Sequence, residues 1–73
     1  MNIWKRIKKD ESRFRKRVYL NILNGRYLAI DKISDNYSVS LYNKEFRKID
    51  HRDNYSLQGA IIESGEMIGE GLE

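Results

Sequence analysis

The chain contains no cysteine, no proline and only one histidine, His51. Without cysteine it can form neither disulfide bonds nor a cysteine-ligated zinc site, and a single histidine excludes a site built from several histidines. We therefore expect no metal and no other cofactor. The lack of cysteine also fits a reducing compartment, so we expect a cytoplasmic protein.

Long hydrophobic runs are missing as well. No apolar stretch approaches the roughly 18 residues of a membrane-spanning helix, and the N-terminal residues lack the apolar core of a secretory signal. The 73 residues suffice for one small domain, which buries only about 60% of the surface of its unfolded chain. We predict a single domain over residues 1–73, with no membrane partner and no small-molecule substrate.

Positive charge is concentrated near the N-terminus, although the net charge of the chain is only +3. Up to residue 17, Asp10 and Glu11 are outnumbered by the basic residues Lys5, Arg6, Lys8, Lys9, Arg13, Arg15, Lys16 and Arg17. From Ala60 onward the charged residues are all acidic: Glu63, Glu66, Glu70 and Glu73. Such opposed ends indicate either a basic arm for a polyanion or two ends that pair with each other.

Residues 3–16 are predicted to form a basic amphipathic helix. Their apolar side chains recur at three-, four- and seven-residue spacings: Ile3, Trp4, Ile7 and Phe14. These spacings place the side chains on one face of a helix. Asp10 and Glu11 interrupt the stripe, but they lie at helical spacing from several basic residues and can form weak ion pairs with them. We expect this helix to pack on a sheet, with its basic side in solvent.

The middle of the chain is predicted to form an antiparallel meander, because its apolar period changes to two. A loop over residues 23–25 would place Val18 opposite Ile30. A turn centred on residues 35–36 would place Ile30 opposite Leu41. Both turns put the same residues on one core face: Val18, Leu20, Ile22, Leu28, Ile30, Val39 and Leu41. The opposite face would carry Tyr19, Asn21, Tyr27, Ala29, Asp31, Ser38, Ser40 and Tyr42.

The C-terminal third has a weaker pattern. The stretch "KEFRKI" suits a short helical turn or an irregular strand, and "DHRDN" suits a polar loop. Residues 55–70 can form a second hairpin or a helix that Ser56 would open. Because Gly59, Gly65 and Gly69 would each cost about 1 kcal/mol inside a helix, the hairpin is favoured.

Together these patterns predict an α+β fold, in which the helix over 3–16 packs on a small antiparallel sheet. The sheet would contain three to five strands, open or closed into an SH3-like barrel, with the meander over 18–43 and a short hairpin or irregular segment over 55–70. Trp4, Ile7 and Phe14 would complete the core from the helix.

The basic N-terminal segment predicts a polyanionic partner. Phosphate binding needs clustered Lys and Arg more than any particular motif. We predict a non-enzymatic protein that binds nucleic acid, with phosphate contacts from Lys5, Arg6, Lys8, Lys9, Arg13, Arg15, Lys16, Arg17 and Arg26. Additional stacking or interface contacts would come from Tyr19, Tyr27 and Tyr42.

A second function class fits the same residues. The chain is rich in Asn, Lys, Ile and Tyr, as are proteins of AT-rich bacteria and their phages. The alternative is therefore a phage or mobile-element inhibitor that occludes a host protein of defence, transcription or replication. Tyr and Arg tend to dominate the energy of such interfaces. An exposed edge strand, or pairing of the oppositely charged ends, would also permit a homodimer.

Two short motifs lack the context that catalysis requires. His51 lies between carboxylates in "DHRD", but such clusters are usual in solvated turns. The glycines of "GEMIGEG" are not followed by the Lys and Ser or Thr of a phosphate-binding loop. We predict no catalytic residues.

Overall fold

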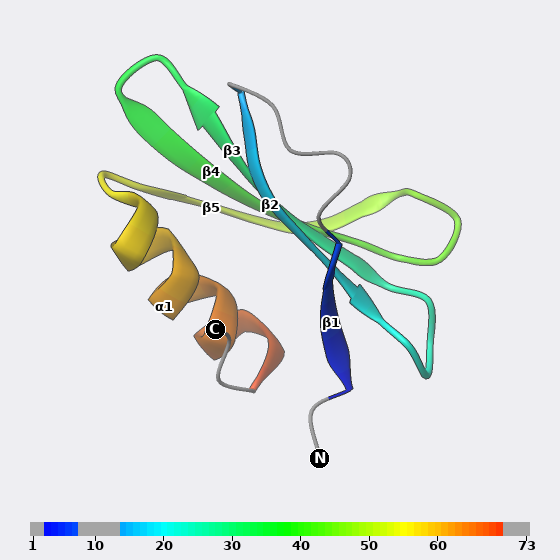
Figure 1. Ribbon diagram of the computed structural model, residues 1–73. Coiled ribbons are helices and arrows are strands. Elements are labelled where there is room, and N and C mark those ends of the chain that lie inside the picture. The colour runs from blue at the N-terminus through cyan, green and yellow to red at the C-terminus, as the bar shows by residue number, and fades with distance from the viewer. Residues whose placement is uncertain (1–2, 8–13, 70–73) are drawn as a thin grey trace.

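The structure is a computed structural model that describes residues 3–7 and 14–69. These residues form a five-stranded sheet and a C-terminal helix (Figure 1). The elements are β1 (Trp4–Ile7), β2 (Arg15–Asn21), β3 (Tyr27–Ile33), β4 (Asn36–Tyr42), β5 (Lys48–Asn54) and α1 (Leu57–Ile68). Neighbouring strands are all antiparallel and follow one another in chain order, with β1 and β5 at the edges. The predicted antiparallel sheet is confirmed, and its described strands form an open sheet rather than a barrel.

The predicted N-terminal helix over residues 3–16 is wrong. The first described segment is the edge strand β1, and residues 8–13 lie outside the described residues. β1 pairs with β2, with Trp4 opposite Asn21. The side chain of Trp4 is buried in the core. Strand pairing and this burial outweigh the helical spacing of a few apolar residues, because local preferences are weak and tertiary contacts override them.

The β2–β3 loop is one residue longer than predicted. The backbone N–H of Asn21 donates to the carbonyl of Arg26 at 2.9 Å, so the loop comprises residues 22–25. The buried Asn21 side chain stabilises this loop, because its Oδ1 accepts from the N–H groups of Leu23 at 2.9 Å and Asn24 at 3.1 Å. A shift of one residue in strand register moves every side chain to the other face.

The two faces of β2 are therefore the reverse of those predicted. Val18 lies opposite Ala29, and Tyr19 lies opposite Leu28. Tyr19 consequently enters the core instead of sharing a face with Tyr27. The predicted core residues that lie on the other face are Ile7, Val18 and Leu20.

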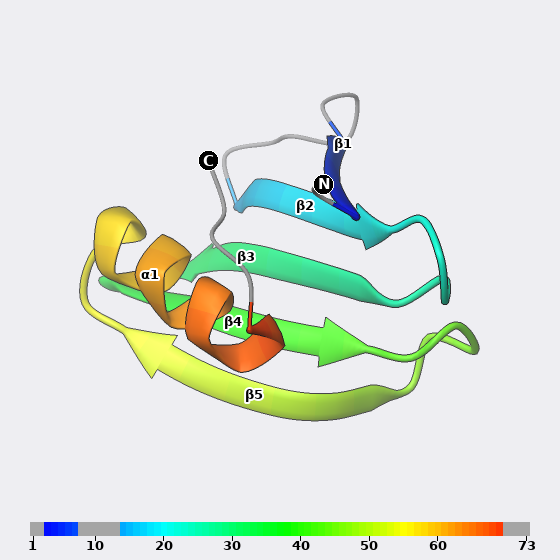
Figure 2. The same cartoon turned by 90° about the horizontal axis from the view of Figure 1, so that it is seen from below.

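The core lies between the sheet and α1, which crosses one face of the sheet (Figure 2). Its buried residues are Trp4, Tyr19, Leu28, Ile30, Val39, Leu41 and Ala60. The β3 and β4 members belong to the predicted core face, although Ile30 lies opposite Val39 instead of Leu41. This difference of two residues preserves the faces. Ile22 and Phe14, also predicted in the core, are 52% and 62% exposed.

The C-terminal segment forms α1, where the sequence favoured a hairpin. The Oγ of Ser56 accepts from the N–H of Gly59 at the start of the helix, and Gly69, with a φ of 68°, ends it by donating to the carbonyl of Gly65. The side chains that face the sheet recur at helical spacing: Leu57, Ala60, Ile61, Ser64, Met67 and Ile68. Burial of this stripe outweighs the low helix propensity of the glycines. Within the described ranges, no helix is long and apolar enough to cross a membrane.

Gly59 is required by the close approach of α1 to Asn54. A Cβ at this position would overlap the Oδ1 of Asn54, which accepts from the N–H of Tyr55 at 2.9 Å. We expect Gly59→Ala to lower the free energy of unfolding by about 1 kcal/mol, although alanine normally stabilises a helix interior by about the same amount. Urea unfolding followed by circular dichroism measures the change. In an Asn54→Ala background only an approach of 3.0 Å to the Oγ of Ser56 remains, and Gly59→Ala should then be less destabilising. A stabilising effect in the unmodified background would contradict this account.

Candidate functional site

The sheet face that α1 does not cover, here called the open face, is the candidate site. Its central row runs across the strands through Ile7, Val18, Ala29, Ser40 and His51. The neighbouring row contains Lys5, Leu20, Tyr27, Tyr42 and Lys48. The open face is therefore neither a uniform polar surface nor a second apolar core, since aliphatic, aromatic and charged residues alternate on it.

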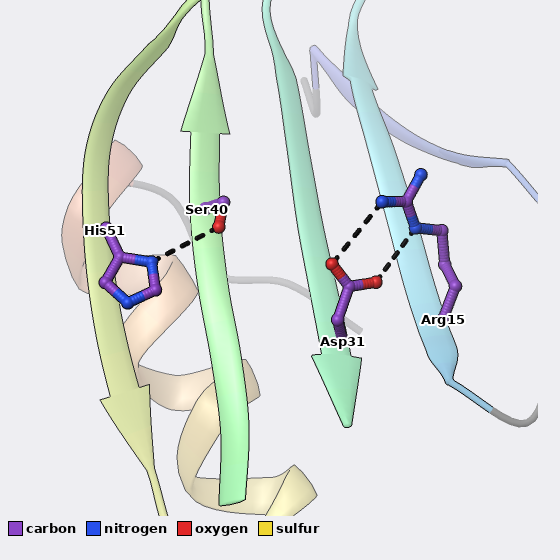
Figure 3. Close-up of polar contacts among 4 residues, drawn as sticks. All are labelled: Arg15, Asp31, Ser40 and His51. Atoms are coloured by element: carbon purple, nitrogen blue, oxygen red, sulfur yellow. Dashed lines mark hydrogen bonds and ion pairs between the residues drawn. The ribbon is translucent and has the colours of Figure 1, made fainter. Parts of the chain in front are cut away.

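Polar contacts cross the strands on the open face, with α1 behind the sheet (Figure 3). The Nε of Arg15 donates to Asp31 at 2.9 Å between β2 and β3. The Nδ1 of His51 lies 3.4 Å from the Oγ of Ser40 between β5 and β4. The "DHRD" segment is thus part of strand β5, and the predicted polar loop at this place is wrong.

His51 also lies between a carboxylate and serines, the residue types of a hydrolytic triad. Its Nε2 is 3.2 Å from Asp53, and its Nδ1 is 3.3 Å from the Oγ of Ser38. However, Ser38 and Ser40 are only 4% and 2% exposed, and both face the same ring nitrogen. A nucleophile must be reachable by its substrate. We therefore interpret this cluster as a link between β4 and β5. Among the described residues there is also no group of His, Asp and Glu that could hold a metal ion.

Three aromatic side chains gather at one end of the open face. Tyr27 and Tyr42 lie opposite each other on β3 and β4. Phe46, from the β4–β5 turn, stacks on Tyr27 with ring centroids 5.1 Å apart and an interplanar angle of 22°. The ammonium group of Lys48 lies 6.0 Å from the ring centroid of Tyr42. We call Tyr27, Tyr42 and Phe46 the aromatic group.

Phe46 occupies a backbone conformation that usually requires glycine. Its φ is 64°, and its side chain is nevertheless 68% exposed. Asn43 holds the turn, because its Oδ1 accepts from the N–H groups of Glu45 at 3.0 Å and Arg47 at 2.9 Å. A left-handed conformation costs a non-glycine residue about 1–2 kcal/mol. An exposed aromatic residue in a strained turn makes Phe46 a candidate site residue.

Basic residues surround the aromatic group at the same end of the sheet. The β2–β3 and β4–β5 loops meet there, since a Cβ on Gly25 would lie 3.2 Å from the Cβ of Lys44, and both loops lie at the right of Figure 2. The exposed basic residues of these loops and the adjoining strands, here called the basic end, are Lys5, Arg26, Lys44, Arg47 and Lys48. The nearby carboxylates in the described residues are Glu45, in the turn, and Asp50, on the helix-covered face of β5.

A hollow of about 610 Å³ opens in this face beside the aromatic group. Val18 and Ala29 are both nearly buried and form its floor, while Leu20 and the two tyrosines line its sides. The hollow exists because Ala29 is the smallest residue of its row and larger side chains stand on both neighbouring strands. Its lining is mainly apolar, and Arg15 lies at the far end from the aromatic group.

Some of the predicted site residues lie around this place. Lys5 and Arg26 belong to the basic end, and Tyr27 and Tyr42 belong to the aromatic group. The predicted phosphate-binding residues that lie outside the described residues are Lys8, Lys9 and Arg13.

The other predicted residues lie away from the aromatic group and the basic end. Arg15 pairs with Asp31 on the open face, and Lys16 occupies a bulge in β2 near the opposite end of the sheet. Arg6 lies opposite Tyr19 on the helix-covered face. The guanidinium group of Arg17 donates to the hydroxyl of the buried Tyr19 at 3.0 Å. These residues therefore do not form the single basic surface that a helix would have given.

The sequence interpretation missed Phe46, Lys44, Arg47 and Lys48. They belong to the stretch "KEFRK", for which the sequence pattern predicted only a short helical turn or an irregular strand. The same combination of aromatic and basic residues, applied to this stretch, would have marked it as a candidate site.

No family model matches the sequence, and no significantly similar curated protein or solved structure was found.

Proposed function

We propose that this protein binds single-stranded nucleic acid, without catalysis, through the aromatic group and the basic end. The observation that carries the proposal is the position of Phe46, which is exposed, strained, stacked on Tyr27 and located in the same turn as Lys44 and Arg47. Proteins that bind single strands combine aromatic rings on which bases stack with cations that follow the phosphates. Both components are present here within one end of the sheet.

A single strand fits this surface better than a duplex. Bases can stack on exposed rings only when their faces are accessible, which in a duplex requires unpairing. Among residues 3–7 and 14–69, no helix protrudes from the open face, and grooves of duplex DNA are most often entered by a helix or a ribbon. The aromatic group would contact the bases, while the basic end would contact phosphates on either side.

The direct test is fluorescence anisotropy with labelled single- and double-stranded DNA and RNA at two salt concentrations. We expect single strands to bind more tightly than duplexes of the same length. A site that neutralises about four phosphates should give a slope of about −3 for log K against log salt, because each contact with a single strand releases about 0.7 counterions.

Absence of binding even at low salt would contradict the proposal. The same surface would then be assigned to a protein partner, as in the alternative of an occluding inhibitor. In that case the apolar hollow would receive a side chain of the partner, and the affinity would depend only weakly on salt.

Phe46→Gly separates binding from stability. Glycine relieves the left-handed strain of about 1–2 kcal/mol, while the loss of stacking on Tyr27 costs about 0.5–1.5 kcal/mol. We therefore expect the free energy of unfolding to change by less than about 1 kcal/mol in either direction. Affinity for single strands should fall by about tenfold, because one stacking platform is lost. Thermal unfolding and anisotropy measure the two effects. Unchanged affinity would exclude Phe46 from the site.

A further inference from the structure

The hollow in the open face is continuous with the aromatic group. Tyr27, Tyr42 and Phe46 all line the hollow, and Phe46 also stacks on Tyr27. A strand whose bases stack on Phe46 would therefore pass directly over the opening. Its volume of about 610 Å³ lies within the range of about 300–1,000 Å³ that is usual for small-molecule sites.

The lining of the hollow suits a flat, largely apolar group. The floor consists of the aliphatic Val18 and Ala29, and the tyrosine rings stand at one side. Groups of this kind offer stacking and dispersion contacts but few hydrogen bonds, so they favour an aromatic ring without demanding one base identity.

The charges beside the hollow indicate the class of molecule to which that aromatic ring belongs. Lys5 and Lys48 stand at the two ends of the row that contains both tyrosines, and Lys44 lies in the turn next to Phe46. An apolar side chain of a protein partner would gain little from this arrangement. A base linked on both sides to phosphates would gain from all three cations.

We propose that the hollow holds one unpaired base of a single-stranded nucleic acid, while adjacent bases stack on Phe46. This inference rests on the proposed function and specifies its ligand: a strand with at least one base that can leave the stack. Binding should therefore depend on the presence of bases, and only weakly on which base is present.

The test compares two fluorescent probes of equal length, oligothymidylate and an abasic oligonucleotide with the same number of phosphates. Ala29→Leu fills the hollow without changing any charge. We expect the wild-type protein to bind oligothymidylate at least about tenfold more tightly than the abasic probe. In A29L this preference should fall to the part that stacking on Phe46 supplies, whereas affinity for the abasic probe and its salt dependence should remain unchanged. Ala29→Ser, of nearly the original size, is the matched control and should retain the preference.

A second measurement does not depend on a folded variant. Oligothymidylate carrying one 5-iodouracil is photocrosslinked to the wild-type protein, and the modified residue is identified by mass spectrometry. Crosslinks to the aromatic side chains that line the hollow, Tyr27, Tyr42 and Phe46, are expected. Crosslinks confined to residues that do not line the hollow would overturn the inference.

The outcomes separate this inference from the proposed function. If neither probe binds, both fail. If oligothymidylate binds and A29L retains the full preference over the abasic probe, the hollow is not the base site, and the proposed function remains.

Discussion

Reversing the charge of Lys44 and Lys48 is expected to lower the affinity for single-stranded oligonucleotides by about a hundredfold at low salt. Both lysines are exposed and stand beside the aromatic group, where the strand would pass. Each neutralised phosphate contributes through counterion release, so replacing a cation by Glu removes one contact and adds a repulsion. The slope of log K against log salt should become shallower by the contribution of about one to two phosphate contacts.

The matched control reverses Lys16 and Lys32, which lie near the opposite end of the sheet. Both double variants change the formal net charge from +3 to −1, since four units are lost from the +3 of the chain. The ammonium group of Lys32 also lies 6.0 Å from a tyrosine ring centroid, as that of Lys48 does. We expect the control to bind within a few-fold of wild type. Equal weakening in both variants would indicate a diffuse effect of net charge and would contradict a localised site.

Replacing Leu28 by alanine is expected to lower the free energy of unfolding by about 2–5 kcal/mol. Leu28 is fully buried on β3, in the core that Tyr19 and Leu41 share with it. Small domains are stable by only about 5–15 kcal/mol, so such a loss would leave much of the protein near its unfolding transition. Urea unfolding monitored by tryptophan fluorescence is suitable, because Trp4, the single tryptophan of the chain, is buried in the same core.

Ile22→Ala is the control for the strand register. Ile22 is 52% exposed in the β2–β3 loop, so the substitution should change stability by no more than about 0.5 kcal/mol. The register expected from sequence would instead place Ile22 on the core face beside Leu28. A large loss of stability in Ile22→Ala would therefore support that register and contradict the observed one.

The β3–β4 half of the core could be predicted from the sequence. The apolar residues of these two strands alternate with polar or small residues: Leu28, Ile30, Val39 and Leu41. They therefore share a face in the predicted register and in any register shifted from it by two residues. The observed pairing differs from the predicted one by that amount, and the core face is therefore unchanged.

The orientation of β2 could not be predicted in the same way. The stretch "VYLNI" has apolar or aromatic residues at both parities, so either face can be buried. The length of the following loop decides between them, and this length depends on the side chain of Asn21, which bonds to two loop amides. A capping interaction of this kind has no periodic signal in the sequence.

At both ends of the chain the predicted secondary structure differs from the observed one. The N-terminal segment was predicted as a helix and contains the strand β1, and the C-terminal segment was predicted as a hairpin and forms the helix α1. At the N-terminus, a few helically spaced apolar residues were outweighed by pairing of β1 with β2. At the C-terminus, the helical stripe of α1 was present, together with the cap residues Ser56 and Gly69. The low helix propensity of glycine argued against a helix in this segment. Burial of the apolar stripe of α1 against the sheet stabilises the helix by more than the glycines destabilise it.

The candidate site could likewise be predicted only in part from the sequence. The sequence alone indicated a basic protein and named Tyr27 and Tyr42, because composition and strand alternation are local properties. It could not show that the β4–β5 turn brings Phe46 onto Tyr27 and places Lys44 beside Gly25.

The sequence by itself determined the chemistry available to this protein: no thiol, one imidazole, a surplus of cations and two alternating strands with a shared core face. The tertiary structure decided which face is buried and where the cations meet. Alternation sets which residues share a face, but only the loop length and the packing of Trp4, Tyr19 and α1 select the face that leaves water. The open face, its hollow and its basic end are consequences of that selection.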